Sequence, residues 1–161
     1  CAAPVLHKST LAKAKASQRS YLAHQLFETA VSVAASWAAA NWPDETPLDL
    51  LCVGQERVSP SYVTGPARTL VFLKALADAK QCPGQEFTAF QELVLDEAAG
   101  FTGAVLVLPA PSPERLALAA SLERRNMDVK TLALTFDRDR EDLPNVRMVR
   151  PASVAEDLAW V

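Results

Sequence analysis

Residues 103–116, GAVLVLPAPSPERL, form the clearest strand-to-helix junction of the chain. A short apolar run at 104–108, bounded by chain breakers, predicts a strand buried on both faces. Ser112 is a favourable N-cap residue for the next helix, and Pro113 suits its first position, where a missing N–H costs nothing. The stretch therefore predicts a strand that passes directly into a helix, the repeating unit of parallel α/β folds.

Helical and strand patterns alternate on both sides of this junction. The apolar periodicity predicts helices over 21–42, 65–80, 87–99, 113–125 and 153–160, and strands over 48–53, 104–108, 129–136 and 146–149. Short apolar strands separated by helices favour parallel pairing, and right-handed crossovers place helices on both faces of the sheet. The predicted fold is an α/β three-layer sandwich with a mostly parallel sheet.

The chain length of 161 residues suits one domain. Residues 1–20 combine small residues and lysines without an apolar face, which predicts a mostly irregular segment before a single domain over 21–161. Gly100 is expected to cap the helix before the central strand. Ser153 and Glu156 are expected to form a capping box at the last helix. Cys1 is expected to mark a cut in a longer protein rather than a lipid-modified terminus.

The bulk composition excludes several classes of function. Half of the residues are apolar, 22% are charged, and the formal net charge is −3, so no basic footprint for nucleic acid is present. No apolar run approaches the length of a membrane span. The three cysteines are far apart, which argues against a zinc site or a disulfide framework. Cys52 is expected to be a buried, reduced thiol, typical of a reducing compartment.

Familiar catalytic motifs are missing from the sequence. The five glycines form neither G-x-G-x-x-G nor G-x-x-x-x-G-K, which argues against the usual nucleotide sites. No G-x-S-x-G elbow is present, and His7 and His24 are the only histidines that could serve as a base. His24 and Glu28 share a helix face, and we interpret them as a polar surface pair rather than as metal ligands.

The ends of parallel strands are where ligands usually bind in α/β folds. Asp137 and Asp139 follow a predicted strand and could hold a hard cation, although the surrounding charged residues are also typical of a solvated loop. The favoured binding surface comprises segments 109–112, 137–140 and 57–64. Its candidate binding residues are Arg57, Ser112, Asp137, Arg138, Asp139 and Arg140.

The order and spacing of five segments resemble one known family. These segments are FETAVSVAASWAAANW, LDLLCVGQERVSP, RTLVFLKALADAK, GAVLVLPAPSPERLALAASLERRNMDVKTLAL and VRMVRPASVAEDLAWV. Together they resemble the C-terminal, von Willebrand factor A-like half of the bacterial domain-of-unknown-function family numbered fifty-eight, over roughly residues 21–161. The match lies in order and spacing, and no single motif is diagnostic.

The resemblance implies a cytoplasmic domain that follows two membrane helices in a longer protein. It also implies a partner, a MoxR-type AAA+ ATPase, and a role in the assembly or maturation of other proteins. The adhesion-type metal site of the wider fold requires Asp-x-Ser-x-Ser after the first strand and a further Asp after a later one. Here HKSTL follows the poor strand candidate AAPVL, and residues 108–110 replace the later Asp. Neutral side chains cannot replace those carboxylates as ligands.

The sequence thus predicts a non-enzymatic protein-interaction domain without a cofactor or a metal. Nucleic acid is not an expected partner, and contact with a membrane is expected only through a segment outside this chain. The alternative is a divalent-metal or small-ligand-dependent enzyme that uses Asp137 and Asp139.

Overall fold

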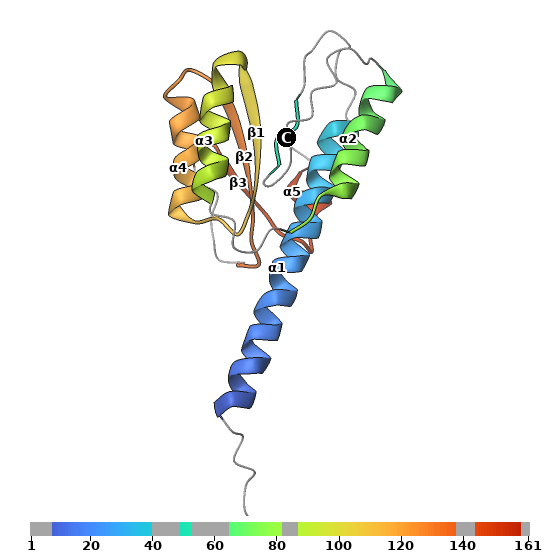
Figure 1. Ribbon diagram of the computed structural model, residues 1–161, viewed down its shortest axis with the longest axis vertical. Coiled ribbons are helices and arrows are strands. Elements are labelled where there is room, and N and C mark those ends of the chain that lie inside the picture. Colours follow the sequence, from blue (N-terminus) through green and yellow to red (C-terminus); the bar gives the residue numbers. More distant parts are fainter. Residues whose placement is uncertain (1–7, 40–48, 53–64, 82–86, 138–143, 159–161) are drawn as a thin grey trace, which may run out of the picture.

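A computed structural model describes residues 8–39, 49–52, 65–81, 87–137 and 144–158. The elements follow in the order α1 (Lys8–Ala39), α2 (Pro66–Asp78), α3 (Phe87–Glu97), the short 3₁₀ helix η1 (Ala98–Gly100), β1 (Gly103–Pro109), α4 (Pro113–Glu123), β2 (Asp128–Leu134), β3 (Val146–Val149) and α5 (Val154–Asp157). Figure 1 shows the described strands side by side, with helices around them.

The described strands form a parallel sheet in the order β1-β2-β3. The β1–β2 register runs from Gly103 opposite Asp128 to Pro109 opposite Leu134. Strand β3 continues the sheet beyond β2, also in parallel. Parallel neighbours need a crossover connection, and α4 provides it between β1 and β2. The predicted α/β class with parallel pairing is therefore confirmed.

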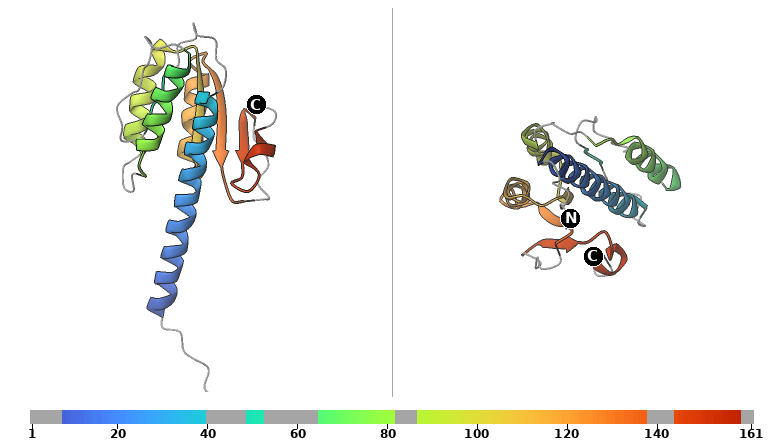
Figure 2. Two further views of the ribbon diagram at one scale, coloured as in Figure 1. Left: turned by 90° about the vertical axis from the view of Figure 1, so that its right-hand side faces the viewer. Right: turned by 90° about the horizontal axis from the view of Figure 1, so that it is seen from below.

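Apolar side chains of the sheet pack on both faces because the pleat alternates their direction. One cluster joins β1 and the start of β2 to α4 and η1, and α3 packs against it. Its buried members are Ala98, Leu106, Leu108, Leu118, Ala119, Leu122, Met127 and Val129. The other cluster joins α1 to the opposite face through Leu26, Val33, Leu132, Leu134 and Val149, with α5 residues packed beside them. Helices thus lie against both faces of the sheet (Figure 2).

The predicted strand-to-helix junction is confirmed in detail. The Ser112 side chain accepts a hydrogen bond from the backbone N–H of Arg115, and Pro113 occupies the first turn of α4. Helix α4 ends at Glu123, two residues before the predicted boundary, and Asn126 follows in the left-handed conformation with φ of 60°. Asn tolerates that conformation better than most residues, so it suits a helix C-terminus.

The predicted irregular segment over residues 1–20 is wrong from Lys8 onward. Helix α1 begins there and projects well beyond the sheet (Figure 1). Residues 15–20 are exposed, so no apolar face is needed, and alanine and lysine sustain the helix through high intrinsic propensity. The apolar periodicity of residues 21–39 therefore marked the packed part of a longer helix.

Three further predictions need correction. In the described part of the predicted strand 48–53, residues 49–52, Leu50 forms only an isolated bridge. Gly100 ends η1 without a left-handed conformation, and the N–H of Phe101 closes the turn by bonding Ala98. Ser153 makes no capping hydrogen bond to the backbone of α5, so the predicted capping box is absent.

None of the helices in the described ranges combines the length and the apolarity that crossing a bilayer requires. Helix α1, with 32 residues, is long enough to cross a bilayer, but it is not apolar enough. Its lysines and other polar residues lower its mean hydropathy below that of a membrane span.

Candidate functional site at the carboxyl edge of the sheet

The carboxyl ends of β1 and β2 meet at one edge of the sheet, because Pro109 lies opposite Leu134 in the parallel register. Residues 110–112 and 135–137 continue from these strand ends. We call these two segments the exit edge. It is the place where parallel α/β sheets usually carry their ligands.

Ala110 takes an unusual conformation at this edge. Its φ of 55° lies in the left-handed region, which disfavours a residue with a Cβ by roughly 1 kcal/mol. Two hydrogen bonds hold it there. The N–H of Ala110 donates to the Leu134 carbonyl at 3.0 Å, and the Arg115 Nη1 donates to the Ala110 carbonyl at 3.0 Å. The turn after β1 is therefore fixed by contacts within the domain.

Arg115 links the exit edge to helix α3. Its guanidinium carbon lies 5.7 Å from the centre of the Phe87 ring, close enough for a cation–π contact. Phe87 in turn packs against Phe90, with ring centres 5.9 Å apart. These contacts stabilise the turn after β1 and the start of α4.

At the end of β2, Thr135 is buried and its N–H donates to the Val149 carbonyl at 3.0 Å. The Thr135 Oγ1 accepts a hydrogen bond from the N–H of Asp137 at 3.1 Å. Asp137 itself is exposed. This side chain hydrogen bond turns the chain outward and presents Asp137 at the exit edge.

The structure brings two of the predicted binding residues, Ser112 and Asp137, to the exit edge. Ser112 serves as the N-cap of α4, whereas Asp137 faces solvent. The other four predicted residues, Arg57, Arg138, Asp139 and Arg140, lie outside the described residues, as do the whole of segment 57–64 and residues 138–140. Within the described ranges no group of three or more His, Cys, Asp or Glu side chains could hold a metal ion.

The His24–Glu28 pair lies on the surface of α1. The His24 Nε2 and the Glu28 Oε1 are 3.9 Å apart, and about 60% of each side chain is exposed. Such exposed pairs contribute little to stability. Their position agrees with the interpretation as a polar surface pair.

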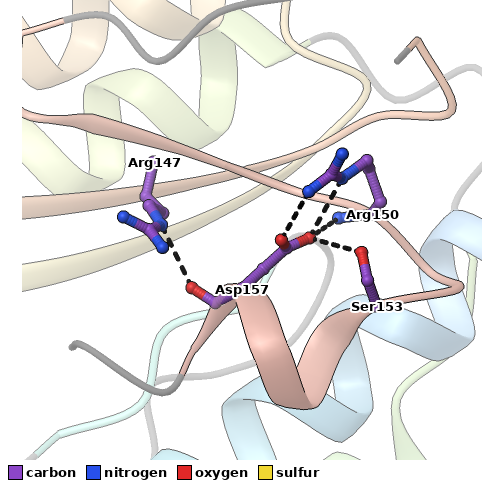
Figure 3. A network of polar contacts seen from close by, with 4 residues as sticks. All are labelled: Arg147, Arg150, Ser153 and Asp157. Carbon is purple, nitrogen blue, oxygen red and sulfur yellow. Dashed lines mark hydrogen bonds and ion pairs between the residues drawn. The ribbon is translucent and has the colours of Figure 1, made fainter.

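A polar cluster at the end of β3 was not predicted from the sequence (Figure 3). Asp157 of α5 receives hydrogen bonds from Arg150 through Nη2 at 2.7 Å, through Nε at 3.3 Å and through the backbone N–H at 2.9 Å. The Ser153 hydroxyl donates to the same carboxylate at 2.9 Å, and the Arg147 Nε donates to the Asp157 carbonyl at 3.0 Å. This cluster fastens α5 to β3.

The same cluster changes the acidity of Asp157. Hydrogen bonds from the Arg150 side chain lower the pKa of Asp157 from 3.8 to about 2, against the opposing effect of burial. The sequence signal was the four-residue spacing of Ser153 and Asp157, which places both on one side of a helical turn. The capping-box pattern drew attention to Glu156 instead, which is exposed.

A cavity of about 950 Å³ borders β1, and Asp128 and Lys130 of β2 also line it. Every residue of β1 lines it, together with residues 49–52 and parts of α1, α2 and α3. Cys52 stands in this wall, half-buried rather than fully buried as expected, and burial raises the pKa of its thiol. The cavity could not be predicted from the sequence, because its walls come from segments that lie far apart along the chain.

Comparisons with protein-family models, with curated proteins and with solved structures give no match for this chain.

Proposed function

We propose that this chain is a non-enzymatic protein-interaction domain. It works with a MoxR-type AAA+ ATPase in the assembly or maturation of other proteins. The proposed fold is a von Willebrand factor A-like sandwich, in which β1, β2 and β3 are one half of a larger parallel sheet. The parallel order of these strands and the helices on both faces support that fold.

The proposal rests on one observation: the polar side chains at the exit edge are engaged in hydrogen bonds to the backbone. The Ser112 hydroxyl, the Arg115 guanidinium, and the Thr135 hydroxyl all bond to backbone within the domain. A catalytic edge keeps such groups available for a substrate. Here they instead brace the turns that follow β1 and β2, and Asp137 is exposed beside them. A braced edge that carries an exposed charged side chain suits recognition of a protein partner.

Charge reversal at the residues that follow Asp137 in the sequence tests this proposal. The double variant Arg138→Glu/Arg140→Glu is expected to lose binding to a MoxR-type AAA+ ATPase by at least tenfold, because opposite charges across an interface become like charges. The matched control is Arg124→Glu/Lys74→Glu, which makes the same charge change at exposed positions on α4's C-terminal side and on α2. Both proteins are assayed by surface plasmon resonance with the ATPase immobilised.

Two results would contradict the proposal. If the unmodified domain does not bind the ATPase, the proposed partnership is wrong. If the Arg138→Glu/Arg140→Glu variant binds as tightly as the control, the interaction surface lies elsewhere on the domain.

The second candidate function is a divalent-metal or small-ligand-dependent enzyme that uses Asp137 and Asp139. The exposure of Asp137 at a strand end is the observation that favours it. Titration calorimetry with magnesium, manganese and calcium separates the two functions. Binding at millimolar concentration or tighter that is abolished by Asp137→Ala would establish the second function, whereas the interaction domain is expected to produce no such signal.

A further inference from the structure

Basic and acidic residues are concentrated in different segments of this chain. Residues 1–27 contain four Lys and Arg residues and no Asp or Glu, whereas residues 81–114 contain five Asp and Glu residues and no Lys or Arg. The basic segment includes the part of α1 that projects beyond the sheet, and the acidic segment includes α3 (Figure 1). The projecting part of α1 and helix α3 therefore carry charge of opposite sign, each without compensating residues of its own.

On α1, two exposed basic residues continue the face that packs on the sheet. Leu26 and Val33 are buried against the sheet, and residues 15, 19 and 22 precede Leu26 at spacings of three and four, which places them on the same helix face. Lys15 and Arg19 are exposed, and Leu22 is half-buried. The packing face of α1 thus extends past the sheet as a stripe of two cations and one leucine. We call Lys15 and Arg19 the basic pair.

On α3, two acidic residues share an exposed face. Glu92 and Asp96 are four residues apart and both exposed, and Leu93 beside them is 37% exposed. We call Glu92 and Asp96 the acidic pair. The two helices therefore present the same arrangement with opposite charge, in which a pair of like charges lies beside one leucine.

Two arginines near α3 leave the acidic pair uncompensated, because they contact other groups. The Arg125 Nη1 donates to the Leu95 carbonyl near the end of the helix, and the Arg115 guanidinium lies over the Phe87 ring at its start. Near the basic pair, the first acidic residue along α1 is Glu28, and it lies beside His24.

Each pair is unfavourable within its own helix. Like charges four residues apart on a helix repel each other, whereas opposite charges at that spacing attract. Across the described ranges, neither the basic pair nor the acidic pair takes part in an ion pair. Both helices would therefore be stabilised by a surface of opposite charge placed over the pair.

Within one copy the two pairs lie apart. Helix α1 packs on one face of the sheet and α3 on the other, and the basic pair lies on the part of α1 beyond the sheet (Figure 1). Between two copies the pairs match. Four residues of helix rise about 6 Å, so both pairs have the same separation along their helices, and two ion pairs can form at once when the helices lie side by side. Leu22 and Leu93 add an apolar contact beside them.

We propose that the projecting part of α1 from one copy of the chain docks along α3 of a second copy, with the basic pair facing the acidic pair. A second copy fits because the chain itself carries the complementary surface at the matching spacing. A membrane surface would require a broader apolar face on α1, and a nucleic acid would be repelled by the formal net charge of −3.

The contact joins two different surfaces, so it is heterologous. It closes into a dimer where the second α1 also meets the second α3, and it continues into longer assemblies where it does not. This self-association goes beyond the proposed function and does not depend on the ATPase partnership.

Sedimentation velocity over a range of protein concentrations measures the association. At 0.1 M salt the mean sedimentation coefficient of the unmodified protein is expected to rise with concentration. At 1 M salt the Debye length falls from about 10 Å to about 3 Å, which screens exposed charges. The association constant is therefore expected to fall at least tenfold between the two salt concentrations.

Charge exchange between the two helices identifies the contact. Lys15→Glu/Arg19→Glu and Glu92→Lys/Asp96→Lys are each expected to self-associate at least tenfold more weakly than the unmodified protein. An equimolar mixture of the two variants is expected to associate, because each then meets a partner of opposite charge. A variant with all four substitutions keeps the net charge and is expected to recover association to within about threefold of the unmodified protein.

The matched control is Lys74→Glu/Arg124→Glu, which makes the same charge change at exposed positions outside both stripes. It is expected to associate within about twofold of the unmodified protein. Circular dichroism melting confirms that every variant is folded before the comparison.

Four outcomes overturn the proposal. An unmodified protein that stays monomeric at all concentrations would exclude the self-association. An association constant that does not change with salt would exclude a contact made by exposed charges. A folded double variant of either helix that associates as tightly as the control would place the contact elsewhere. A folded variant with all four substitutions that associates no better than the double variants would show that the two pairs do not face each other.

Discussion

The Arg150–Ser153–Asp157 cluster predicts a specific loss of stability on changing Asp157→Asn. The variant keeps the size and shape of the side chain but removes its charge. Asp157 is 6% exposed, and its carboxylate accepts four hydrogen bonds from Arg150 and Ser153. Hydrogen bonds to a buried carboxylate are stronger than those between neutral groups. We therefore expect the variant to fold but to unfold more easily.

The pKa of Asp157 sets the size of the effect. Lowering it from 3.8 to about 2 means that folding favours the ionised carboxylate by about 2 kcal/mol. Because the folded-state pKa is the lower one, this stabilisation is fully present above pH 3.8 and is lost as the pH falls toward 2. Linkage predicts a loss of about 1 kcal/mol by pH 3 and about 2 kcal/mol by pH 2 from this one group.

Urea unfolding followed by circular dichroism measures both quantities. At pH 7 the free energy of unfolding of Asp157→Asn is expected to lie about 2 kcal/mol below that of the unmodified protein. The difference between the two proteins is expected to shrink by about 1 kcal/mol at pH 3, because only the unmodified protein loses the contribution of Asp157. Comparing the two proteins at each pH cancels the titration of all other carboxylates.

Glu156→Gln is the matched control, since Glu156 is exposed on the same helix and is expected to change stability by less than about 0.5 kcal/mol. An Asp157→Asn protein as stable as this control at pH 7 would refute the importance of the cluster. A gap between Asp157→Asn and the unmodified protein that stays constant from pH 7 to pH 3 would refute the lowered pKa.

Two further substitutions test the fold. Ala110→Gly is expected to stabilise the domain by roughly 0.5–1 kcal/mol in urea unfolding, because glycine adopts a φ of 55° without strain; a destabilised variant would contradict the left-handed turn. Leu132→Ala is expected to lower the unfolding free energy by about 2–5 kcal/mol, since Leu132 is 1% exposed between β2 and α1. The exposed Leu70→Ala is its control, and an equal effect of both would place Leu132 outside the core.

Local patterns in the sequence predicted most of the described elements. The junction at 103–116, with Ser112 as N-cap and Pro113 in the first turn, appears in the structure as expected. The parallel pairing of β1, β2 and β3 also followed from the alternation of strands and helices. The start of α1 was missed because the prediction depended on an apolar stripe, whereas residues 15–20 are exposed and their helix is favoured by intrinsic propensity.

The candidate site was harder to predict from the sequence than the fold. Placing Ser112 and Asp137 at one edge required only that both follow parallel strands. The polar cluster at the end of β3 required knowledge of which side of α5 faces β3, and the spacing of Ser153 and Glu156 suggested a different contact. The binding role of four residues outside the described ranges stays a prediction: Arg57, Arg138, Asp139 and Arg140.

The sequence by itself determined the α/β class, the junction after β1 and the lack of familiar catalytic motifs, because propensity, capping and periodicity act between residues that are neighbours along the chain. Only the tertiary structure decided that a cavity borders β1 and that Arg150 closes on Asp157. These features depend on how distant segments pack together. No local sequence pattern predicts the space that remains between two helices and the edge of a sheet.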